Sequence, residues 1–292
     1  MEELKSCPIC SGKEFRPYKK AIDYTVSKQE FCIVSCKSCG FKFTNPRPQE
    51  SELPNYYKAE AYISHTDTSA GLVNKLYKLV RSFTLKFKLN LVRPYLGGKL
   101  LLDIGAGTGA FLNEVQKKYP NVKGVEPDQD AAQLAFEKYG LQLLPESHLN
   151  NLEDKSCDVI TMWHVLEHVP RLKDRVEELS RILADDGIVV IAVPNYQAYD
   201  ATYYDKYWGA YDVPRHLYHF DKQSIELLFS GFGFKLKETR IMPFDSFYVS
   251  ILSEKYKNGK NNLLKGMWIG LLSLIKGLSG NTSSLIYIFK RK

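Results

Sequence analysis

The sequence predicts an α/β protein, with a largely parallel sheet of seven strands in residues 99–292 behind a small cysteine-rich module in residues 1–48. From Lys99 onward, short apolar segments alternate with amphipathic ones, which is typical of βαβ units. Two CxxC pairs lie in the first forty residues, and a glycine-rich turn follows the first apolar segment of the larger part. Residues 49–98 are expected to link the two parts.

The overall composition is that of an ordinary globular protein. The chain has 292 residues, 44% of them hydrophobic, enough to bury at least one large core. Its net charge of +7 permits an anionic partner or a membrane surface without requiring either. We expect no nucleic-acid partner. The opening MEELKSCPIC lacks the basic patch and apolar run of a signal peptide, so we expect a cytoplasmic protein with reduced cysteines.

The N-terminal cysteines have the spacing of a zinc site. Cys7 with Cys10, and Cys36 with Cys39, form two knuckles that can supply four thiolates to one tetrahedral ion. The second knuckle, CKSCGFKFTNPRP, resembles zinc-ribbon sequences, and a hairpin over 15–34 can fill the gap between the pairs. The metal would be structural, because a module this small has too little core to fold alone. The alternative is that these are buried thiols without a metal, while the remaining Cys32 and Cys157 are expected to be core residues.

The linker is expected to be helical. Apolar residues recur at helical spacing from Tyr77 to Leu91, before Pro94 and two glycines stop the pattern. The preceding segment YYKAEAYISH, which contains Tyr62 and His65, has the aromatic and polar mixture of an N-terminal lid. It could equally pack the linker against the larger domain.

The strands of the larger domain follow from short apolar segments. The last segment has no helix after it and ends the chain, as an antiparallel strand inserted between neighbours would. The predicted strands are Lys99–Ile104, Val122–Glu126, Leu141–Leu144, Asp158–Trp163, Gly187–Pro194, Phe234–Ile241 and Ser284–Lys290.

The turn after the first strand predicts a small-molecule site. In LLLDIGAGTGAFL, Gly105, Gly107 and Gly109 lie where strand passes into helix, so the backbone can approach a ligand closely. Asp103 places a carboxylate where a pyrophosphate would be repelled, which favours a ligand with positive charge. Glu126 ends the second strand, at the position from which a carboxylate can bind a ribose diol.

The motifs DIGAGTGAFL, GVEPD, CDVITMWHVLEHV and DDGIVVIAVPN resemble those of class I S-adenosylmethionine-dependent methyltransferases, which have a Rossmann-like sheet. The resemblance covers residues 99–292. It implies that the glycine loop wraps the methionine part of the cofactor, that Glu126 holds the ribose, and that Glu146 or Ser147 flanks the adenine. Trp163 would line the sulfonium side, unless it is a core aromatic. The remaining implied cofactor residues are Ala106, Thr108, Pro127 and His164.

The stretch HVLEH, residues 164–168, allows two metal interpretations. It has the HxxEH pattern of inverted zinc proteases, but a predicted strand precedes it and Pro170 follows it, whereas a protease needs the motif on one helix. The stretch also resembles the ExxEH sequence of ubiquinone-pathway O-methyltransferases, which is associated with a divalent cation in that family. Here His164 replaces the first Glu, which disfavours magnesium. Alternatively, His168 caps or packs against the next helix.

The segment 196–220 is the expected acceptor lid. It interrupts the strand and helix alternation and is crowded with tyrosines and histidines. Its VPRHLYHF stretch resembles one found in class I methyltransferases, which implies that Arg215, His216 and His219, with Tyr211, lie at or near the substrate. His216 is the first candidate for a catalytic base and His168 the second. The alternative is that His216 and His219 hold the lid in place.

We therefore predict a methyltransferase for a small-molecule acceptor, a sugar or phenolic precursor, because sugar C-methyltransferases resemble this layout. One alternative is a lipid-linked acceptor at the membrane surface. The lysine-flanked stretch 261–279 could lie in the interface, or form a helix packed on the sheet. The apolar run 266–275 is shorter than the roughly 20 residues of a spanning helix. A third alternative is a non-catalytic zinc-ribbon protein that binds the cofactor and a partner.

Overall fold

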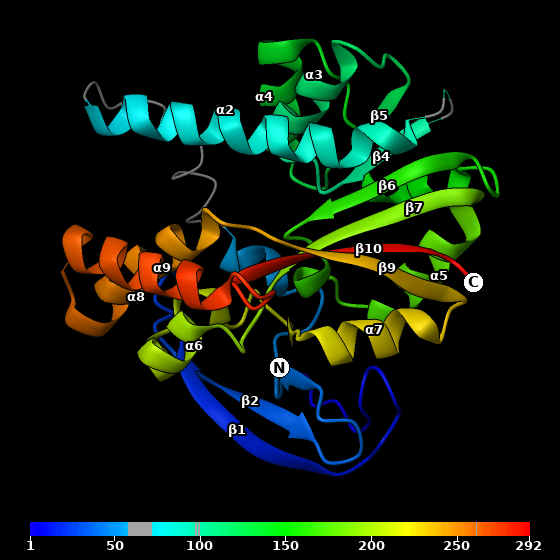
Figure 1. Ribbon diagram of the computed structural model, residues 1–292. Helices are drawn as coiled ribbons and strands as arrows, with labels where there is room; N and C mark the ends of the chain where they lie inside the picture. The colour runs from blue at the N-terminus through cyan, green and yellow to red at the C-terminus, as the bar shows by residue number, and fades with distance from the viewer. Residues whose placement is uncertain (58–71, 97, 99, 261) are drawn as a thin grey trace.

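A central sheet of six strands organises the larger part of the molecule (Figure 1). The computed structural model describes residues 1–57, 72–96, 98, 100–260 and 262–292. The strand order is β5-β4-β6-β7-β10-β9. The strands β5, β4, β6 and β7 are parallel, and β10 pairs antiparallel with both β7 and β9, as predicted for the last strand. Their bounds are β4 Leu100–Ile104, β5 Val122–Val125, β6 Cys157–Trp163, β7 Leu183–Pro194, β9 Phe234–Ile241 and β10 Ser284–Arg291.

The predicted strand Leu141–Leu144 is reduced to a single parallel bridge between Val125 and Leu144. Backbone hydrogen bonds flank this bridge on both sides, Leu144 N to Gly124 O and Glu126 N to Leu144 O, each 2.9 Å long. The 3-10 helix Glu146–Asn151 begins directly after Pro145, so the chain leaves the edge of the sheet before a second bridge forms. The seventh strand position therefore exists only as one residue at the edge beside β5.

Helices cover both faces of this sheet, because its central strands are apolar on both sides. Val159 of β6 packs into a core shared with α2, α3 and α4, while the next residue, Ile160, packs into the core shared with α5 and α7. Figure 1 shows the two helical layers on opposite sides of the sheet. The helices are α2 Leu72–Val92, α3 Ala110–Gln116, α4 Gln129–Tyr139, α5 Leu172–Ile182 and α7 Lys222–Ser230. The expected helical linker is present as α2.

A second, smaller sheet joins the N-terminal residues to the expected acceptor segment. Its order is β1-β2-β3-β8, with β1 Phe15–Ile22, β2 Glu30–Cys36, β3 Lys42–Thr44 and β8 Tyr218–His219. β1 and β2 form the predicted hairpin. β8 comes from the segment after β7 and pairs antiparallel with β3. The cysteine-rich part and the acceptor segment are thus hydrogen-bonded into one sheet.

Two antiparallel helices, α8 Asp245–Asn258 and α9 Leu263–Gly277, lie between β9 and β10 in the chain. Both contact α6, Tyr199–Tyr204, which belongs to the acceptor segment. Among the helices that the structure describes, none is long and apolar enough to cross a membrane.

Candidate active site

The glycine loop leaves β4 with a backbone that favours glycine. Gly105, Gly107 and Gly109 have φ angles of 73°, 54° and 73°, in the left-handed region where a side chain is strained. A Cβ on Gly105 would also lie 2.4 Å from Cγ2 of Val165. Gly109 is the N-cap of α3, so the loop ends at the positive end of a helix. Ala106 and Thr108 complete this loop between the glycines.

Glu126 ties the glycine loop to the end of β5. Its carboxylate accepts hydrogen bonds from the backbone N–H of Gly107, at 2.7 Å, and of Asp128, at 2.9 Å. Burial raises its pKa, against the effect of these two hydrogen bonds. Glu146 lies close enough to Glu126 to raise that pKa further, and it pairs with Arg175. The predicted ribose and adenine residues, with the exposed Pro127 and Ser147, therefore lie at one edge of the sheet.

Asp103 is a buried carboxylate beside the glycine loop. It is 2% exposed and accepts a 2.5 Å hydrogen bond from the hydroxyl of Thr161 on β6. Burial raises its pKa to about 7, although Thr161 and the ammonium of Lys88 both oppose that shift. Lys88 comes from α2, and its Nζ lies 4.4 Å from the ring centroid of Trp163. A carboxylate and an aromatic face thus lie together here, an arrangement that suits a cation, and the ammonium of Lys88 lies beside both.

Trp163 lies at the edge of the core that contains α2 and α3. It ends β6, is only partly buried, and packs edge to face on Phe111 with ring centroids 5.4 Å apart. Its indole N–H has no hydrogen-bond partner among the described residues. An aromatic residue at the carboxyl end of a parallel strand is placed where ligands bind in such sheets.

His164 is held as a cation between two carboxylates. Its Nε2 lies 2.9 Å from Asp245 of α8, and its Nδ1 lies 3.4 Å from Glu167. Burial would lower its pKa, but the two carboxylates dominate and raise the pKa to about 10. His164 also has a φ of 58°, so the chain turns sharply after Trp163. A permanently protonated imidazole cannot act as a base near neutral pH.

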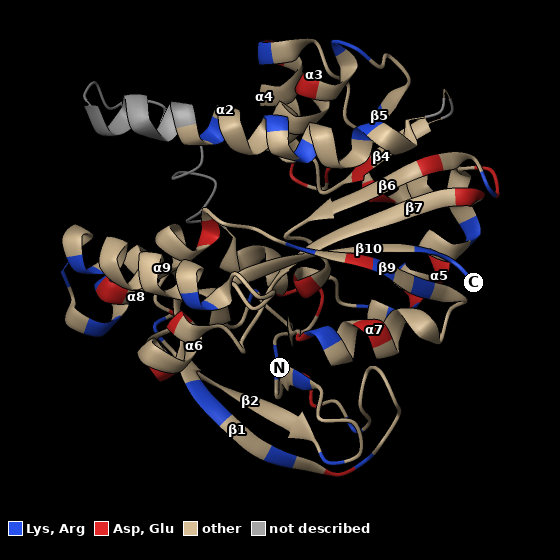
Figure 2. Cartoon of the chain, viewed as in Figure 1, with Lys and Arg blue, Asp and Glu red and all other residues tan. Residues whose placement is uncertain are grey.

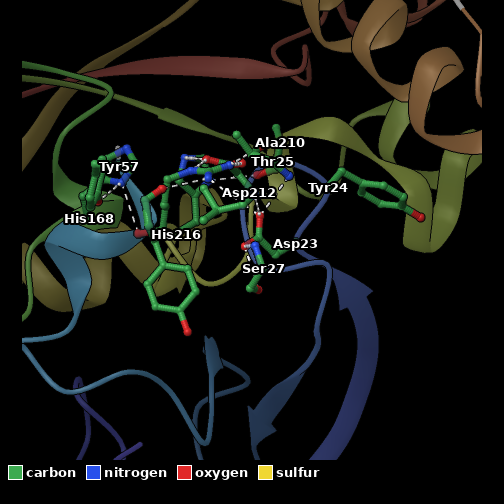
Figure 3. A network of polar contacts seen from close by, with 12 residues as sticks. Asp23, Tyr24, Thr25, Ser27, Tyr57, His168, Ala210, Asp212 and His216 are labelled. Atoms are coloured by element: carbon green, nitrogen blue, oxygen red, sulfur yellow. Dashed lines mark hydrogen bonds and ion pairs between the residues drawn. The ribbon is translucent and has the colours of Figure 1, made fainter. Parts of the chain in front are cut away.

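His168 and His216 lie next to each other, with Tyr57 on the far side of His168 (Figure 3). His168 Nδ1 lies 3.0 Å from Tyr57 Oη and donates to the Arg215 carbonyl at 3.1 Å, while His216 Nδ1 donates to the Ala210 carbonyl at 2.9 Å. The two rings are 4.6 Å apart, edge to face. In a neutral imidazole, a protonated Nδ1 leaves Nε2 free to accept a proton or to bind a metal.

Glu167 completes this group of titratable side chains. One oxygen of Glu167 and one ring nitrogen of each of His168 and His216 lie within 4.8 Å of one another. Both Glu167 oxygens are buried without a hydrogen-bond partner among the described residues. Burial, followed by the neighbouring His216, lowers the pKa of His168 to about 4, so this imidazole is neutral. The group can remove a proton from an acceptor, and its donor set could also hold a borderline metal ion.

Of the remaining predicted lid residues, Arg215, His219 and Tyr211 are buried against the smaller sheet. The guanidinium of Arg215 is buried, and it pairs with Asp212, donates to Thr25 at 2.7 Å and to the Tyr56 carbonyl at 3.1 Å. His219 is buried with its Nε2 3.2 Å from Thr44 Oγ1. Tyr211 packs edge to face against His219. The predicted lid residues Tyr62 and His65 lie outside the described residues.

The four predicted zinc ligands converge. The Sγ atoms of Cys7 and Cys39 are 3.6 Å apart, as are those of Cys10 and Cys36, and all four lie within 4.8 Å of one another. A tetrahedral zinc ion with bonds of about 2.3 Å requires sulfur separations of about 3.8 Å. Burial opposes ionisation of Cys36, but the backbone N–H groups of Cys39 and Ser38 lower its pKa to about 7. The residues therefore fit a zinc ion.

A family model described as "Methyltransferase domain" matches residues 82–239, which is more than half of the chain. The chain belongs to this methyltransferase family. Among curated relatives, an uncharacterized methyltransferase of Mycobacterium bovis is 34% identical over 99 residues, 32% of this chain and 39% of the relative. A ubiquinone biosynthesis O-methyltransferase of Psychrobacter cryohalolentis is 29% identical over 109 residues, 34% of this chain and 42% of the relative. The matches thus span less than half of these relatives.

Solved structures agree with this methyltransferase assignment at the level of the fold. The magnesium protoporphyrin IX methyltransferase of Synechocystis, solved with bound S-adenosylhomocysteine, has a TM-score of 0.56 at 14% identity, covering 84% of this chain and all of its own. A putative sarcosine dimethylglycine methyltransferase of Galdieria sulphuraria has a TM-score of 0.51 at 14% identity, covering 82% of this chain and 98% of its own. The fold is that of the class I S-adenosylmethionine-dependent methyltransferases.

The structure adds residues to this methyltransferase site that the sequence did not single out. Lys88 reaches the Asp103 pocket from α2, and Asp245 reaches His164 from α8. Thr161 was assigned only to a strand, yet its hydroxyl bonds Asp103. No motif surrounds Lys88 or Asp245, so only the tertiary arrangement reveals them.

Proposed function

We propose that this methyltransferase transfers the methyl group of S-adenosylmethionine to a hydroxyl or carbon of a small-molecule acceptor. The observation that carries the proposal is the glycine loop held by Glu126, next to the carboxylate of Asp103 and the ring of Trp163. S-adenosylmethionine supplies an activated methyl group on a sulfonium. The chain binds the cationic methionine part at Asp103 and Trp163, the ribose at Glu126, and the adenine at Glu146 or Ser147.

Methyl transfer needs alignment first and proton removal only for a poor nucleophile. We assign proton removal to Nε2 of His216, with His168 as the second candidate, because the Nδ1 of each is engaged by a backbone carbonyl. Glu167, buried beside them and also ion-paired with His164, would stabilise the imidazolium that forms. This arrangement is suited to a phenol or a sugar hydroxyl, and the Psychrobacter relative is itself an O-methyltransferase.

We further propose that Cys7, Cys10, Cys36 and Cys39 hold a structural zinc ion. The support is their sulfur separations and the single sheet that links β3 to β8. Zinc would thereby fix the acceptor segment as well as the N-terminal residues, without taking part in the chemistry.

Calorimetric titration with S-adenosylmethionine tests the cofactor site, with Glu126→Gln and Asp103→Asn as paired variants. We expect binding by the native chain and a loss of at least tenfold in affinity in each variant, because each interaction involves a charged group. No binding by folded native protein would refute the proposal.

Turnover with a panel of phenolic and sugar acceptors tests the chemistry. His216→Gln should lower kcat by about a hundredfold while cofactor affinity is unchanged. Tight cofactor binding without turnover on any acceptor, with a macromolecular partner retained through residues 1–48, would favour the non-catalytic alternative.

A further inference from the structure

Helix α9 turns its large apolar side chains toward solvent. Leu264 is 84% exposed, Trp268 60% and Ile275 55%. Together with their neighbours on the same side they form what we call the apolar stripe: Leu263, Leu264, Met267, Trp268, Leu271, Ile275 and the C-cap residue Leu278. These positions recur at the three- and four-residue spacing of one helical face. An ordinary surface helix presents such a face to the core.

The opposite face of α9 carries the buried Ile269 and a row of small residues that fix this orientation. Gly266, Gly270, Ser273 and Gly277 are buried. A Cβ on Gly266 would lie 2.7 Å from Cα of Ile251, and one on Gly270 would lie 2.7 Å from Cα of Phe247, both in α8. The two backbones are thus in close contact, as in small-residue packing between membrane helices. If α9 rotated about its axis, leucines would take the place of the glycines at the contact with α8, where there is no room for them. The apolar stripe therefore cannot face the core.

The surroundings of the apolar stripe are strongly basic. Residues 255–283 contain no Asp or Glu, and their lysines are Lys255, Lys257, Lys260, Lys265 and Lys276. The first three are exposed and lie in or just after the end of α8, close to where α9 begins, and Lys276 lies at the far end of α9. Figure 2 shows blue segments along this helical hairpin. Lys265 pairs with the buried Glu254 at 3.2 Å, so it is partly neutralised.

We propose that the α8–α9 hairpin docks this protein on an anionic membrane surface, with α9 lying in the plane of the interface and its apolar stripe inserted. A helix of 15 residues is about 22 Å long, enough to lie along the interface. The exposed leucines and the tryptophan can insert among the acyl chains, while the flanking lysines pair with acidic headgroups. The described helices contain no membrane-crossing candidate, in agreement with a peripheral contact.

A second copy of the chain is a poorer occupant of the apolar stripe. In a pair about a twofold axis, residue i of one copy contacts residue j of the other and j contacts i, so each end of α9 lies opposite an end of its copy. The lysines at both ends of α9 would then face like charges, with no acidic residue between 255 and 283 to balance them. An anionic bilayer instead satisfies the apolar stripe and the lysines at once.

The docking surface continues into the acceptor segment. Lys276 Nζ lies 3.7 Å from the ring centroid of Tyr199, and Lys257 Nζ lies 5.2 Å from that of Tyr203, both in α6. A docked protein would therefore hold α6 close to the headgroups. The docking itself does not depend on the proposed methyl transfer, so a membrane test and a turnover test can fail separately.

Co-sedimentation of the full chain with vesicles tests the proposal. We compare phosphatidylcholine vesicles with an equimolar mixture of phosphatidylcholine and phosphatidylglycerol, at low and at high sodium chloride. The native protein should bind the anionic vesicles and be released by salt. Trp268→Gln and Leu264→Gln should each weaken binding by about tenfold. Neutralising Lys255, Lys257 and Lys260 together to Gln should weaken it by about a hundredfold.

Phe136→Gln is the matched control, because Phe136 is 50% exposed on the distant helix α4. It should bind like the native chain, and thermal unfolding should show that all variants remain folded. Absence of native binding to anionic vesicles, or unchanged binding in Trp268→Gln, would overturn the proposal. So would a native dimer in analytical ultracentrifugation that Trp268→Gln converts to a monomer, because the apolar stripe would then be a subunit interface.

Discussion

Asp103→Asn is expected to stabilise the cofactor-free protein while it damages cofactor binding. Burial raises the pKa of Asp103 from 3.8 to about 7. The folded state therefore binds its proton more tightly than the unfolded chain does, and stability falls as pH rises from about 4 to about 7. Asn carries no charge at any pH, and its oxygen can still accept the Thr161 hydroxyl. The variant therefore escapes this loss.

The magnitude follows from the two pKa values. The destabilisation by Asp103 grows to about 2 kcal/mol at pH 5 and about 4 kcal/mol at pH 8, and it is flat above that. The free energy of unfolding of Asp103→Asn should therefore exceed that of the native chain by more at pH 8 than at pH 5. Urea unfolding at the two pH values, without cofactor, measures this difference.

Saturating S-adenosylmethionine should narrow the variant's advantage at pH 8 by about 1.4 kcal/mol for each tenfold difference in affinity, because only the native carboxylate gains from the cofactor's positive charge. A variant that is less stable than the native chain at pH 8 without cofactor would refute the reasoning. An advantage that does not change with pH would also refute it, since the effect would then be unrelated to ionisation.

Three further predictions concern other parts of the site. Gly105→Ala should abolish measurable cofactor binding in calorimetry, because its Cβ would lie 2.4 Å from a methyl group of a valine. The control Gly140→Ala has a similarly positive φ but open space around the new Cβ, so it should lose only about 1–2 kcal/mol of stability and keep its cofactor affinity. Cys39→Ser should remove the bound zinc and lower the midpoint of thermal unfolding, while the control Cys32→Ser should retain one zinc per chain by elemental analysis. An equal zinc content in the two variants would contradict the four-cysteine site. His164→Gln should destabilise the protein at pH 7. The raised pKa of His164, about 10, means that its protonated form stabilises the folded state fully below pH 6.5, and this stabilisation is lost as pH rises through 10. A deficit in the free energy of unfolding, measured in urea, that persists undiminished above pH 10 would argue against the ion pair.

The parts of the site that sequence alone could predict are those encoded by local backbone geometry. The turn at Gly105 needs a positive φ, which only glycine adopts freely. The glycine in the sequence therefore predicts the turn that the structure shows. The parallel direction of the central strands and the antiparallel direction of β10 follow similarly from the apolar segments, whereas the strand order comes from the structure. The exception is Leu141–Leu144, where three leucines in four residues suggested a strand but the chain enters the 3-10 helix Glu146–Asn151 after one bridge.

Long-range contacts could not be predicted from these patterns. Lys88 lies on a helix whose sequence shows only amphipathic spacing, yet its ammonium reaches the pocket of Asp103. Arg215 and His216 are adjacent in one motif, but the guanidinium joins the smaller sheet while the imidazole joins Glu167. Residue types in a motif indicate which chemistry is available. The fold decides which of them is used for packing.

Helix α9 shows how a small-residue pattern can reverse the usual interpretation of an amphipathic helix. Its large apolar residues suggested a helix packed on the sheet, because burial of such a face normally stabilises a domain. The glycines permit a closer approach of α9 to α8 than any leucine would, so backbone contact is formed on the glycine face instead. The apolar face is then left outside, where it costs free energy in water unless something covers it. That cost is the physical reason to expect a partner surface, and the lysines indicate that the surface is anionic.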